Sequence, residues 1–143
     1  LKYPFGFVRE KEQINEANRL IREIGFTSKL IDAESPVGNL SGGERQGVAI
    51  ARAIYNKAEL IILDEPTNAL SLNETQKVFD FVRNVKKSNR SVLFIGHNIY
   101  HVYDISDRFV ILDRGEVIHQ LDKRDIKTPE ELMKIMRDTI KKH

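Results

Sequence analysis

Residues 40–46 read LSGGERQ, and this stretch decides which fold the sequence predicts. Two consecutive glycines, Gly42 and Gly43, cost backbone entropy, and ordinary side-chain packing gives no reason for both. Ser41 followed three residues later by Glu44 is the capping-box pattern, which predicts that a helix begins here. A helix start that carries glycines leaves its backbone open to close approach. We therefore expect another group to come near this backbone.

Downstream of that helix, apolar runs alternate with helical patterns. LIIL (60–63), SVLFI (91–95) and FVIL (109–112) are short continuous apolar runs, typical of strands covered on both faces. A second capping box, Ser71 with Glu74, predicts a helix between the first two of these strands. The alternation predicts an α/β fold with a mostly parallel sheet and flanking helices.

Local patterns at the two ends of the chain add three elements. Apolar residues at helical spacing predict a helix over residues 12–24, with Gly25 as its C-terminal stop. Arg114-Gly115 is typical of a hairpin turn between strand 109–112 and a strand over 116–121. The sequence TPEE (128–131) combines an N-cap, a proline at the first helical position and a capping glutamate, which predicts a final helix.

Composition sets limits on the function. The chain has 143 residues, 41% hydrophobic and 31% charged, with a formal net charge of +2 and no cysteine. Without cysteine there is no disulfide framework, and a reducing cytosol is the expected setting. The one concentrated group of cations, Lys86, Lys87 and Arg90, fits a solvated helix C-terminus, so no nucleic acid is expected as a partner.

Polar residues that could carry chemistry follow two of the predicted strands. Asp64 and Glu65 come directly after LIIL, and His97 follows SVLFI after one glycine. In parallel sheets, ligands bind beyond the carboxyl ends of the strands. Mg²⁺ held through water would suit Asp64, a glutamate can orient or deprotonate a water, and a histidine can donate to a phosphate oxygen. Taken singly, each residue also has a structural explanation: a strand exit for the carboxylates, a packed side chain for His97 and an N-cap for Ser41.

Four sequence segments, taken in their order along the chain, resemble the motifs of one protein family. LSGGERQ (40–46) resembles the signature motif of ABC-type ATPases, and LIILDEP (60–66) resembles their Walker B segment. TNALS (67–71) stands where the family has its D-loop, and His97 stands where it has its switch histidine. The resemblance covers the whole chain and implies a P-loop NTPase-like fold. It places residues 1–56 in part of the helical subdomain, ending in the signature helix, and residues 57–143 in the C-terminal part of the ATPase core.

The resemblance also implies roles for individual residues. Glu65 and His97 would be catalytic, Glu65 polarising the attacking water and His97 touching the γ-phosphate of ATP, while Asp64 would act on Mg²⁺ through water. The signature residues that would bind ATP held by a partner domain, in trans, are Ser41, Gly42, Gly43, Glu44 and Gln46. The D-loop residues would be Asn68, Ala69, Leu70 and Ser71. The amino end of a helix suits this role because its N–H groups and dipole attract anions.

One motif of the family is absent from these residues. A P-loop requires Gly, four residues, then Gly-Lys-Ser/Thr; Gly42 and Gly47 have the glycine spacing, but Val48 stands where lysine is needed. We therefore expect the chain to be the C-terminal portion of a larger domain and to be inactive as an ATPase alone. An incomplete sheet would expose apolar surface, which predicts a dimer or a swapped assembly.

Among ABC-type ATPases, the sequence is most similar to the subunits of carbohydrate importers. Ser71 replaces the usual D-loop aspartate, as is frequent in those subunits, and the segment from His97 to the hairpin is also similar to them. The resemblance implies a second ATPase domain and membrane permease subunits as partners, and a cytoplasmic location at the inner face of the membrane. Three alternatives stay open: an ABC-type translation factor, a chromosome-maintenance ATPase and a catalytically inert dimerisation module.

Overall fold

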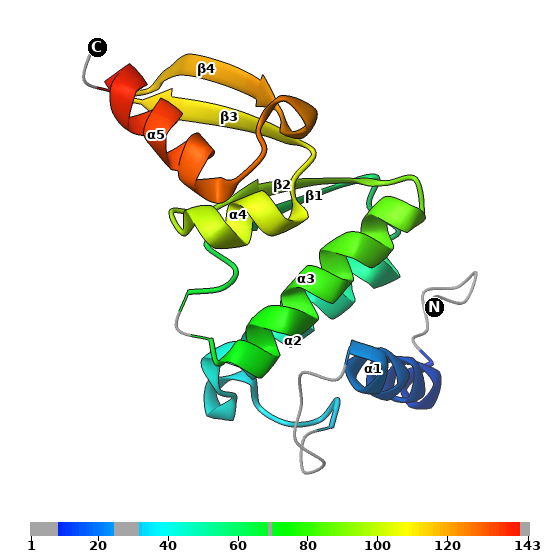
Figure 1. Cartoon of the computed structure of the whole chain (residues 1–143). Helices are drawn as coiled ribbons and strands as arrows, with labels where there is room; N and C mark the ends of the chain where they lie inside the picture. Colours follow the sequence, from blue (N-terminus) through cyan, green and yellow to red (C-terminus); the bar gives the residue numbers. More distant parts are fainter. Residues whose placement is uncertain (1–8, 25–31, 69, 141–143) are drawn as a thin grey trace. The chain divides into compact units, whose positions relative to one another are not determined.

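The computed structural model describes residues 9–24, 32–68 and 70–140 (Figure 1). The elements are α1 (Glu10–Ile24), η1 (Val37–Asn39), α2 (Gly42–Tyr55), β1 (Leu60–Asp64), α3 (Leu72–Lys87), β2 (Ser91–Ile95), α4 (Ile99–Ile105), β3 (Arg108–Asp113), β4 (Glu116–Asp122), η2 (Lys123–Asp125) and α5 (Pro129–Ile140). The α/β class predicted from the alternation of elements is confirmed. Gly25, the predicted stop of the first helix, lies outside the described residues.

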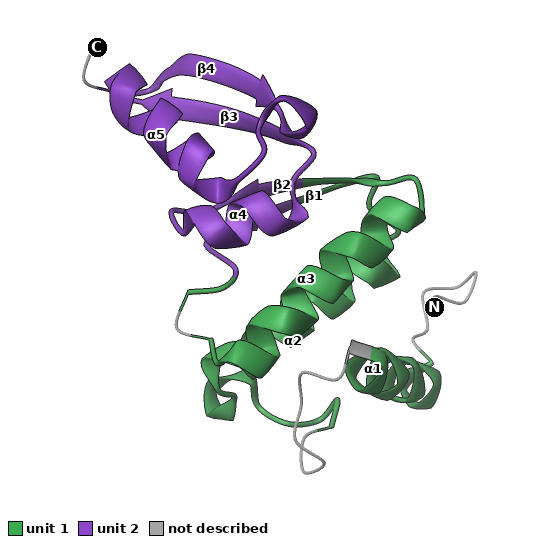
Figure 2. Ribbon diagram, viewed as in Figure 1, with its two compact units in different colours: residues 1–61, 67–92 green, residues 62–66, 93–143 purple. Residues whose placement is uncertain are grey.

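The chain divides into two compact units (Figure 2). Unit 1 comprises residues 1–61 and 67–92, and unit 2 comprises residues 62–66 and 93–143. Unit 1 therefore holds helices α1, α2 and α3, and unit 2 holds α4, the hairpin of β3 and β4, and α5. Strands β1 and β2 each begin in unit 1 and end in unit 2.

The two long helices of unit 1 begin as the sequence predicts. Ser41 caps α2 and Ser71 caps α3, and each serine forms a reciprocal capping box with the glutamate three residues later. One face of α3 is apolar and fully covered, with Val78 and Val85 among the most deeply buried side chains of the described chain. Ile50 of α2 is buried to the same degree. Burial of these branched side chains stabilises this unit.

Strands β1 and β2 form a two-stranded parallel sheet. The amide of Ser91, at the start of β2, donates to the carbonyl of Glu59 just before β1, and the amide of Glu65 just after β1 donates to Ile95 at the end of β2. The strands therefore start together and end together, as the parallel pairing predicts.

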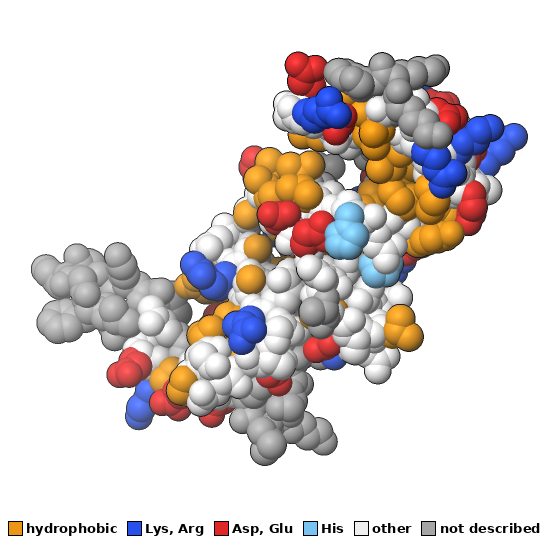
Figure 3. All heavy atoms as spheres, turned by 90° about the vertical axis from the view of Figure 1, so that its left-hand side faces the viewer, with side chains coloured by type: hydrophobic (Ala, Val, Ile, Leu, Met, Phe, Trp, Pro, Cys, Tyr) orange, Lys and Arg blue, Asp and Glu red, His pale blue; other side chains and the backbone are white. Residues whose placement is uncertain are grey.

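The expectation that these strands are covered on both faces is wrong for the described chain. Ile61 and Leu63 are buried, but Leu60 and Ile62 are 55% and 60% exposed. On β2, Leu93 and Ile95 are likewise exposed. Apolar side chains also reach the surface in several places on the face drawn in Figure 3. Because side chains alternate along a strand, one face of this pair is left uncovered in the described chain.

Unit 2 is organised around the β3–β4 hairpin. The pairing is antiparallel, from Arg108 opposite Asp122 to Asp113 opposite Glu116, so β3 belongs to a separate sheet from β1 and β2. The predicted turn is confirmed: Arg114 and Gly115 both have positive φ, 48° and 86°, the conformation that suits a tight hairpin.

Helix α5 packs with this hairpin in unit 2, as Figure 1 shows for the two elements. The core consists of Phe109, Ile126 and Leu132, all nearly inaccessible to solvent. Tyr103 of α4 stacks on Phe109 with ring centroids 6.0 Å apart, and its hydroxyl donates to the carbonyl of Ile126. The ammonium group of Lys123 donates to the carbonyls of Tyr103 and Asp104 at the end of α4. This network holds α4, and with it the end of β2, in a fixed position within the unit.

Candidate functional site

The first turn of α2 has the geometry of a complete capping box. The Ser41 hydroxyl accepts the amide of Glu44 at 3.2 Å, and the Glu44 carboxylate accepts the amide of Ser41 at 2.7 Å. Arg45 adds a bond from its guanidinium to the carbonyl of Leu40. Ser41 thus acts as an N-cap here, and the carboxylate of Glu44 lies at the positive end of the helix, where it is favoured.

The two glycines of this turn have different surroundings. Gly42 is exposed, and a Cβ atom at this position would meet no other described part of the chain within 4 Å. Gly43 is buried, and a Cβ atom there would lie 1.9 Å from Oε1 of Glu74, at the start of α3. The close approach that the glycine pair predicts is therefore observed at Gly43, and the approaching group is a carboxylate of the same chain. Gln46, in the next turn, is partly buried.

At the end of β1, Asp64 is exposed and Glu65 takes an unusual backbone conformation. Glu65 has φ of +47°, in the left-handed region that side chains other than glycine, asparagine and aspartate rarely adopt. Its amide nevertheless donates to the carbonyl of Ile95 at 2.9 Å, so the pairing with β2 continues through it. Such a conformation costs about 1–2 kcal/mol and is found where surrounding structure imposes it.

The structure brings Glu65 and His97 together. Oε1 of Glu65 lies 2.8 Å from Nδ1 of His97, at the ends of the neighbouring strands β1 and β2. The His97 side chain is 77% exposed and that of Glu65 is 38% exposed, so both can reach a molecule from solvent. Asn98 follows at once as the N-cap of α4, accepting the amides of Tyr100 and His101. This cap fixes where β2 ends and α4 begins, and so where His97 lies.

The segment after Pro66 forms a turn that leads into α3. Asn68 is exposed, and the amide of Leu70 donates to the carbonyl of Thr67. Ser71 closes the segment as the N-cap of α3. Ala69 lies outside the described residues.

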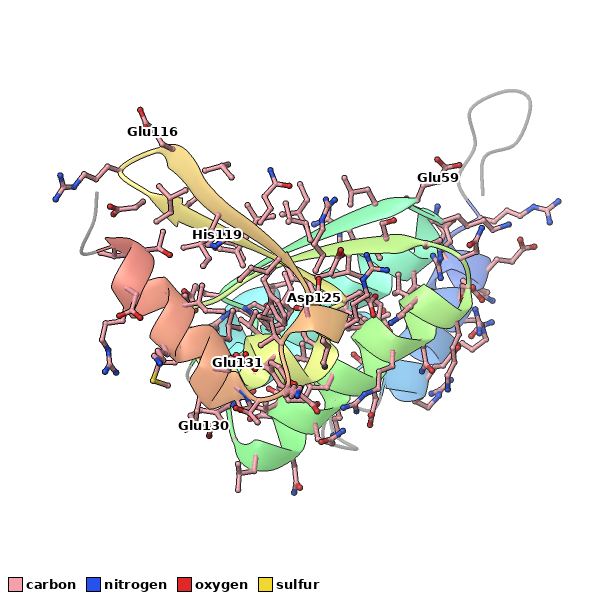
Figure 4. All side chains as sticks on the ribbon, turned by 45° about the horizontal axis from the view of Figure 1, so that its top comes forward. Glu59, Glu116, His119, Asp125, Glu130 and Glu131 are labelled. Carbon is pink, nitrogen blue, oxygen red and sulfur yellow. The ribbon has the colours of Figure 1, made fainter. Side chains whose placement is uncertain are left out.

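Few side chains of the described chain are placed to bind a metal ion together. Among the described residues, no group of three or more His, Cys, Asp or Glu side chains could hold an ion. In unit 2, Glu116 at the hairpin tip lies apart from Glu130 and Glu131 at the start of α5 (Figure 4). Asp64 is one exposed carboxylate at a strand end, which fits Mg²⁺ that keeps its waters and is shared with substrate phosphates. It does not fit an ion held by protein alone.

Sequence reasoning identified both capping boxes but not the contact between them. The sequence pattern predicts Glu74 only as the partner of Ser71, whereas in the structure its second carboxylate oxygen lies against Gly43. These residues are far apart in the chain, and no local pattern predicts which oxygen faces which helix. The positive φ of Glu65 likewise has no signal in the residues around it.

Comparisons with known proteins agree with the motifs. The family model described as ABC transporter matches residues 4–68. The chain is 41% identical over 130 residues to the xylose/arabinose import ATP-binding protein XylG of Sulfolobus acidocaldarius, covering 91% of this chain and 51% of that protein. It is 37% identical over 134 residues to the fructose import ATP-binding protein FruK of Bifidobacterium longum, covering 93% of this chain and 25% of that protein. The chain thus spans about half of the length of the first relative and a quarter of the second.

Solved structures agree as well. The ATP-binding cassette MJ0796, in a dimeric structure of a post-hydrolysis state bound to ADP and Pi, is similar with a TM-score of 0.70 and 26% identity. The match covers 85% of this chain and 51% of that one. Sequence motifs, the family model over residues 4–68, curated relatives and fold all agree, and the chain is similar to ABC-type ATPases.

Proposed function

We propose that this chain is part of the ATP-hydrolysing subunit of an ABC transporter that imports a carbohydrate. The similarity to import ATP-binding proteins for xylose or arabinose and for fructose supports the transport assignment. Residues 1–56 would contribute to the helical subdomain and residues 57–143 to the ATPase core. No described helix is both long and apolar enough to cross a membrane. From the similarity to import ATP-binding proteins, we assign membrane passage to separate permease subunits and place this subunit at the inner face of the membrane.

The observation that carries the catalytic part of the proposal is the contact between Glu65 and His97. In the family's arrangement, Glu65 polarises the water that attacks the γ-phosphate. His97, 2.8 Å away, holds Glu65 in place and donates to a phosphate oxygen. Positioned charges of this kind supply most of the rate in phosphoryl transfer. Asp64 would hold Mg²⁺ through water, and the ion would offset charge on the phosphates.

The binding part of the proposal concerns the first turn of α2. Ser41, Gly42 and Gly43, with Glu44 and Gln46, would bind ATP held by a second ATPase domain. The exposed Gly42 leaves the backbone open on one side, and the helix dipole favours an anion there. The dimeric cassette among the similar structures supports a pairing of two domains. The D-loop residues Asn68, Ala69, Leu70 and Ser71 would lie at the same junction.

ATP hydrolysis by the complete polypeptide tests the catalytic assignment. We expect turnover by the natural protein and a loss of at least about a hundredfold in Glu65→Gln, because a general base contributes at this scale. Circular dichroism and gel filtration of the variant should match the parent protein. Hydrolysis retained in Glu65→Gln would remove Glu65 from this role. Absence of turnover in the natural protein, with ATP and Mg²⁺ present, would instead favour the inert dimerisation module.

A second experiment separates transport from the other functions of this family. The tagged complete polypeptide, purified from solubilised membranes, should carry two permease subunits, and membrane vesicles should take up sugar only with ATP. Recovery with ribosomes would favour a translation factor. Recovery with DNA would favour a chromosome-maintenance ATPase. Either result would overturn the transport proposal.

A further inference from the structure

In unit 1, the carboxylate of Glu74 lies against the backbone of Gly43. A Cβ atom at position 43 would lie 1.9 Å from Oε1 and 2.6 Å from the carboxyl carbon of Glu74, far inside any allowed contact. Any other residue at 43 must therefore displace this carboxylate. At Gly42, the preceding residue, a Cβ atom would meet no such neighbour in the described chain. Glycine thus has a steric reason at position 43 that it lacks at position 42.

The end of the Glu74 side chain can shift, but a shift weakens the bonds that it makes to Ser71. Its Oε2 accepts the amide and the hydroxyl of Ser71, each at 2.8 Å, and its own amide donates to the Ser71 hydroxyl at 3.3 Å. These bonds close the capping box of α3. A side chain at position 43 that pushed the carboxylate away would therefore open the start of a second helix.

The charge of Glu74 suits its position. Hydrogen bonds from the backbone and the hydroxyl of Ser71 hold the pKa of Glu74 below its ordinary value, against the repulsion of the nearby Glu44. The carboxylate is therefore ionised at neutral pH. It lies beside the first turn of α2, where the helix dipole favours a negative charge.

We propose that Glu74 is a positioning residue for the first turn of α2, and that this contact favours glycine at position 43 whether or not a phosphate binds there. Through Ser71 the contact joins the segment 67–71 to the turn that holds Ser41 and Gly43. This inference rests on the proposed function only for its consequence, namely that the two segments serve one nucleotide site. The steric part stands on the geometry alone.

Unfolding of the chain in urea tests the steric part without nucleotide. Gly43→Ala should lower the midpoint in the natural background and in Glu74→Gln, because glutamine keeps both the length of the side chain and the capping bond. In the Glu74→Ala background, Gly43→Ala should leave the midpoint unchanged or raise it, since alanine favours the helix. Gly42→Ala is the matched control and should have the same effect in all three backgrounds. An equal effect of Gly43→Ala in all three backgrounds would overturn the contact.

ATP hydrolysis by the complete polypeptide tests the positioning role. Glu74→Ala should raise the KM for ATP several-fold with little change in kcat, because it loosens a binding turn, and Glu74→Gln should restore the KM. Gly43→Ala should lose activity, and Glu74→Ala added to it should recover part of that loss. An unchanged KM in Glu74→Ala would reduce Glu74 to a helix cap and overturn the positioning role. If the natural protein hydrolyses no ATP, the proposed function fails, and the urea experiment alone decides the contact.

Discussion

At the scale of single residues, the unusual position is Glu65. It is held with φ of +47° at the end of β1, where its carboxylate meets His97. Lys57, Asn89 and Arg114 share a positive φ, but they lie in turns that follow a helix or join two strands. Strain outside an ordinary turn is typical of residues whose orientation matters for function.

Replacement of Glu65 by glycine tests this strain. Glycine adopts positive φ without a steric penalty, so Glu65→Gly should not destabilise the chain and should stabilise it by up to about 1 kcal/mol. The exposed contact with His97 offsets little of this gain. Urea unfolding measures the effect, with Lys57→Gly as a control of the same backbone type. A loss of more than about 1 kcal/mol in Glu65→Gly alone would show that Glu65 contributes to stability rather than to function.

At the scale of elements, helix starts account for most of what the sequence predicts correctly. The capping boxes of α2 and α3, the hairpin turn and the start of α5 depend on residues within about four positions of one another, so local patterns reveal them. In α5 the amide of Glu131 donates to the Thr128 hydroxyl, while its carboxylate accepts the amide of Lys127 rather than that of Thr128. Which of two neighbouring amides a capping carboxylate accepts depends on the path of the chain before the helix. The sequence pattern does not specify that path.

The cap of α3 yields a stability prediction. Ser71→Ala removes the hydroxyl that accepts the amide of Glu74, and we expect a loss of about 1 kcal/mol in the free energy of unfolding. Ser88→Ala, at the other end of the same helix, removes only a bond to the carbonyl of Asn84 and serves as the control. Thermal unfolding of both variants compares the two ends. Equal losses of stability in the two variants would show that the Ser71 cap contributes no more than the bond at the other end of the helix.

The same cap makes the chain sensitive to acid. The pKa of Glu74 is lowered by hydrogen bonds from Ser71, and that of Glu16 is lowered by its hydrogen bond with Arg19. A group whose pKa is lower in the folded state binds fewer protons there, so its contribution to stability is present at neutral pH. That contribution is lost as the pH falls below about 4 and the group takes up a proton.

A comparison of variants at low pH measures this contribution. Glu74→Gln should lose less stability between pH 6 and pH 3 than the parent chain, because the glutamine side chain does not titrate in this range. Urea midpoints at several pH values provide the measurement, with Glu116→Gln at the exposed hairpin tip as a control. If the urea midpoints of Glu74→Gln and of the parent chain fall equally with pH, the Glu74 carboxylate is not the cause of the acid sensitivity.

At the scale of the whole molecule, the sequence predicts the α/β class and the family. It does not predict the uncovered face of β1 and β2 residue by residue. A continuous apolar run such as LIIL is compatible with a strand covered on one face or on both faces. The pattern therefore does not predict that Leu60 and Ile62 are exposed while the two residues that alternate with them are buried. Contacts between residues far apart in the chain, such as Glu74 with Gly43, also cannot be predicted from local sequence patterns.

The uncovered face predicts self-association of the isolated chain. Ile62 and Leu93 expose about half of their surface or more on neighbouring strands, and exposed apolar patches drive association. Light scattering should show a mass that rises with concentration, and the double variant Ile62→Lys with Leu93→Lys should reduce it. Leu72→Lys, at a single exposed leucine, is the control and should have little effect. A monodisperse monomer at high concentration would contradict the prediction.

The isolated chain should also lack ATPase activity. Its 143 residues contain no Gly-x₄-Gly-Lys-Ser/Thr sequence, so they supply no loop to hold the β- and γ-phosphates. We expect phosphate release no greater than that of a protein-free blank. Robust turnover that is lost in Glu65→Gln would contradict this prediction. It would show that other residues of this chain hold the β- and γ-phosphates without a P-loop.

The most direct test of the account is a crystal structure of the complete polypeptide with a non-hydrolysable ATP analogue and Mg²⁺. We predict two copies arranged head to tail, with the terminal phosphate of each analogue within hydrogen-bonding distance of Ser41 and Gly43 of the opposite copy, and near Glu65 and His97 of its own. An analogue bound far from the first turn of α2, or a terminal phosphate with no residue of the second copy beside it, would contradict the account.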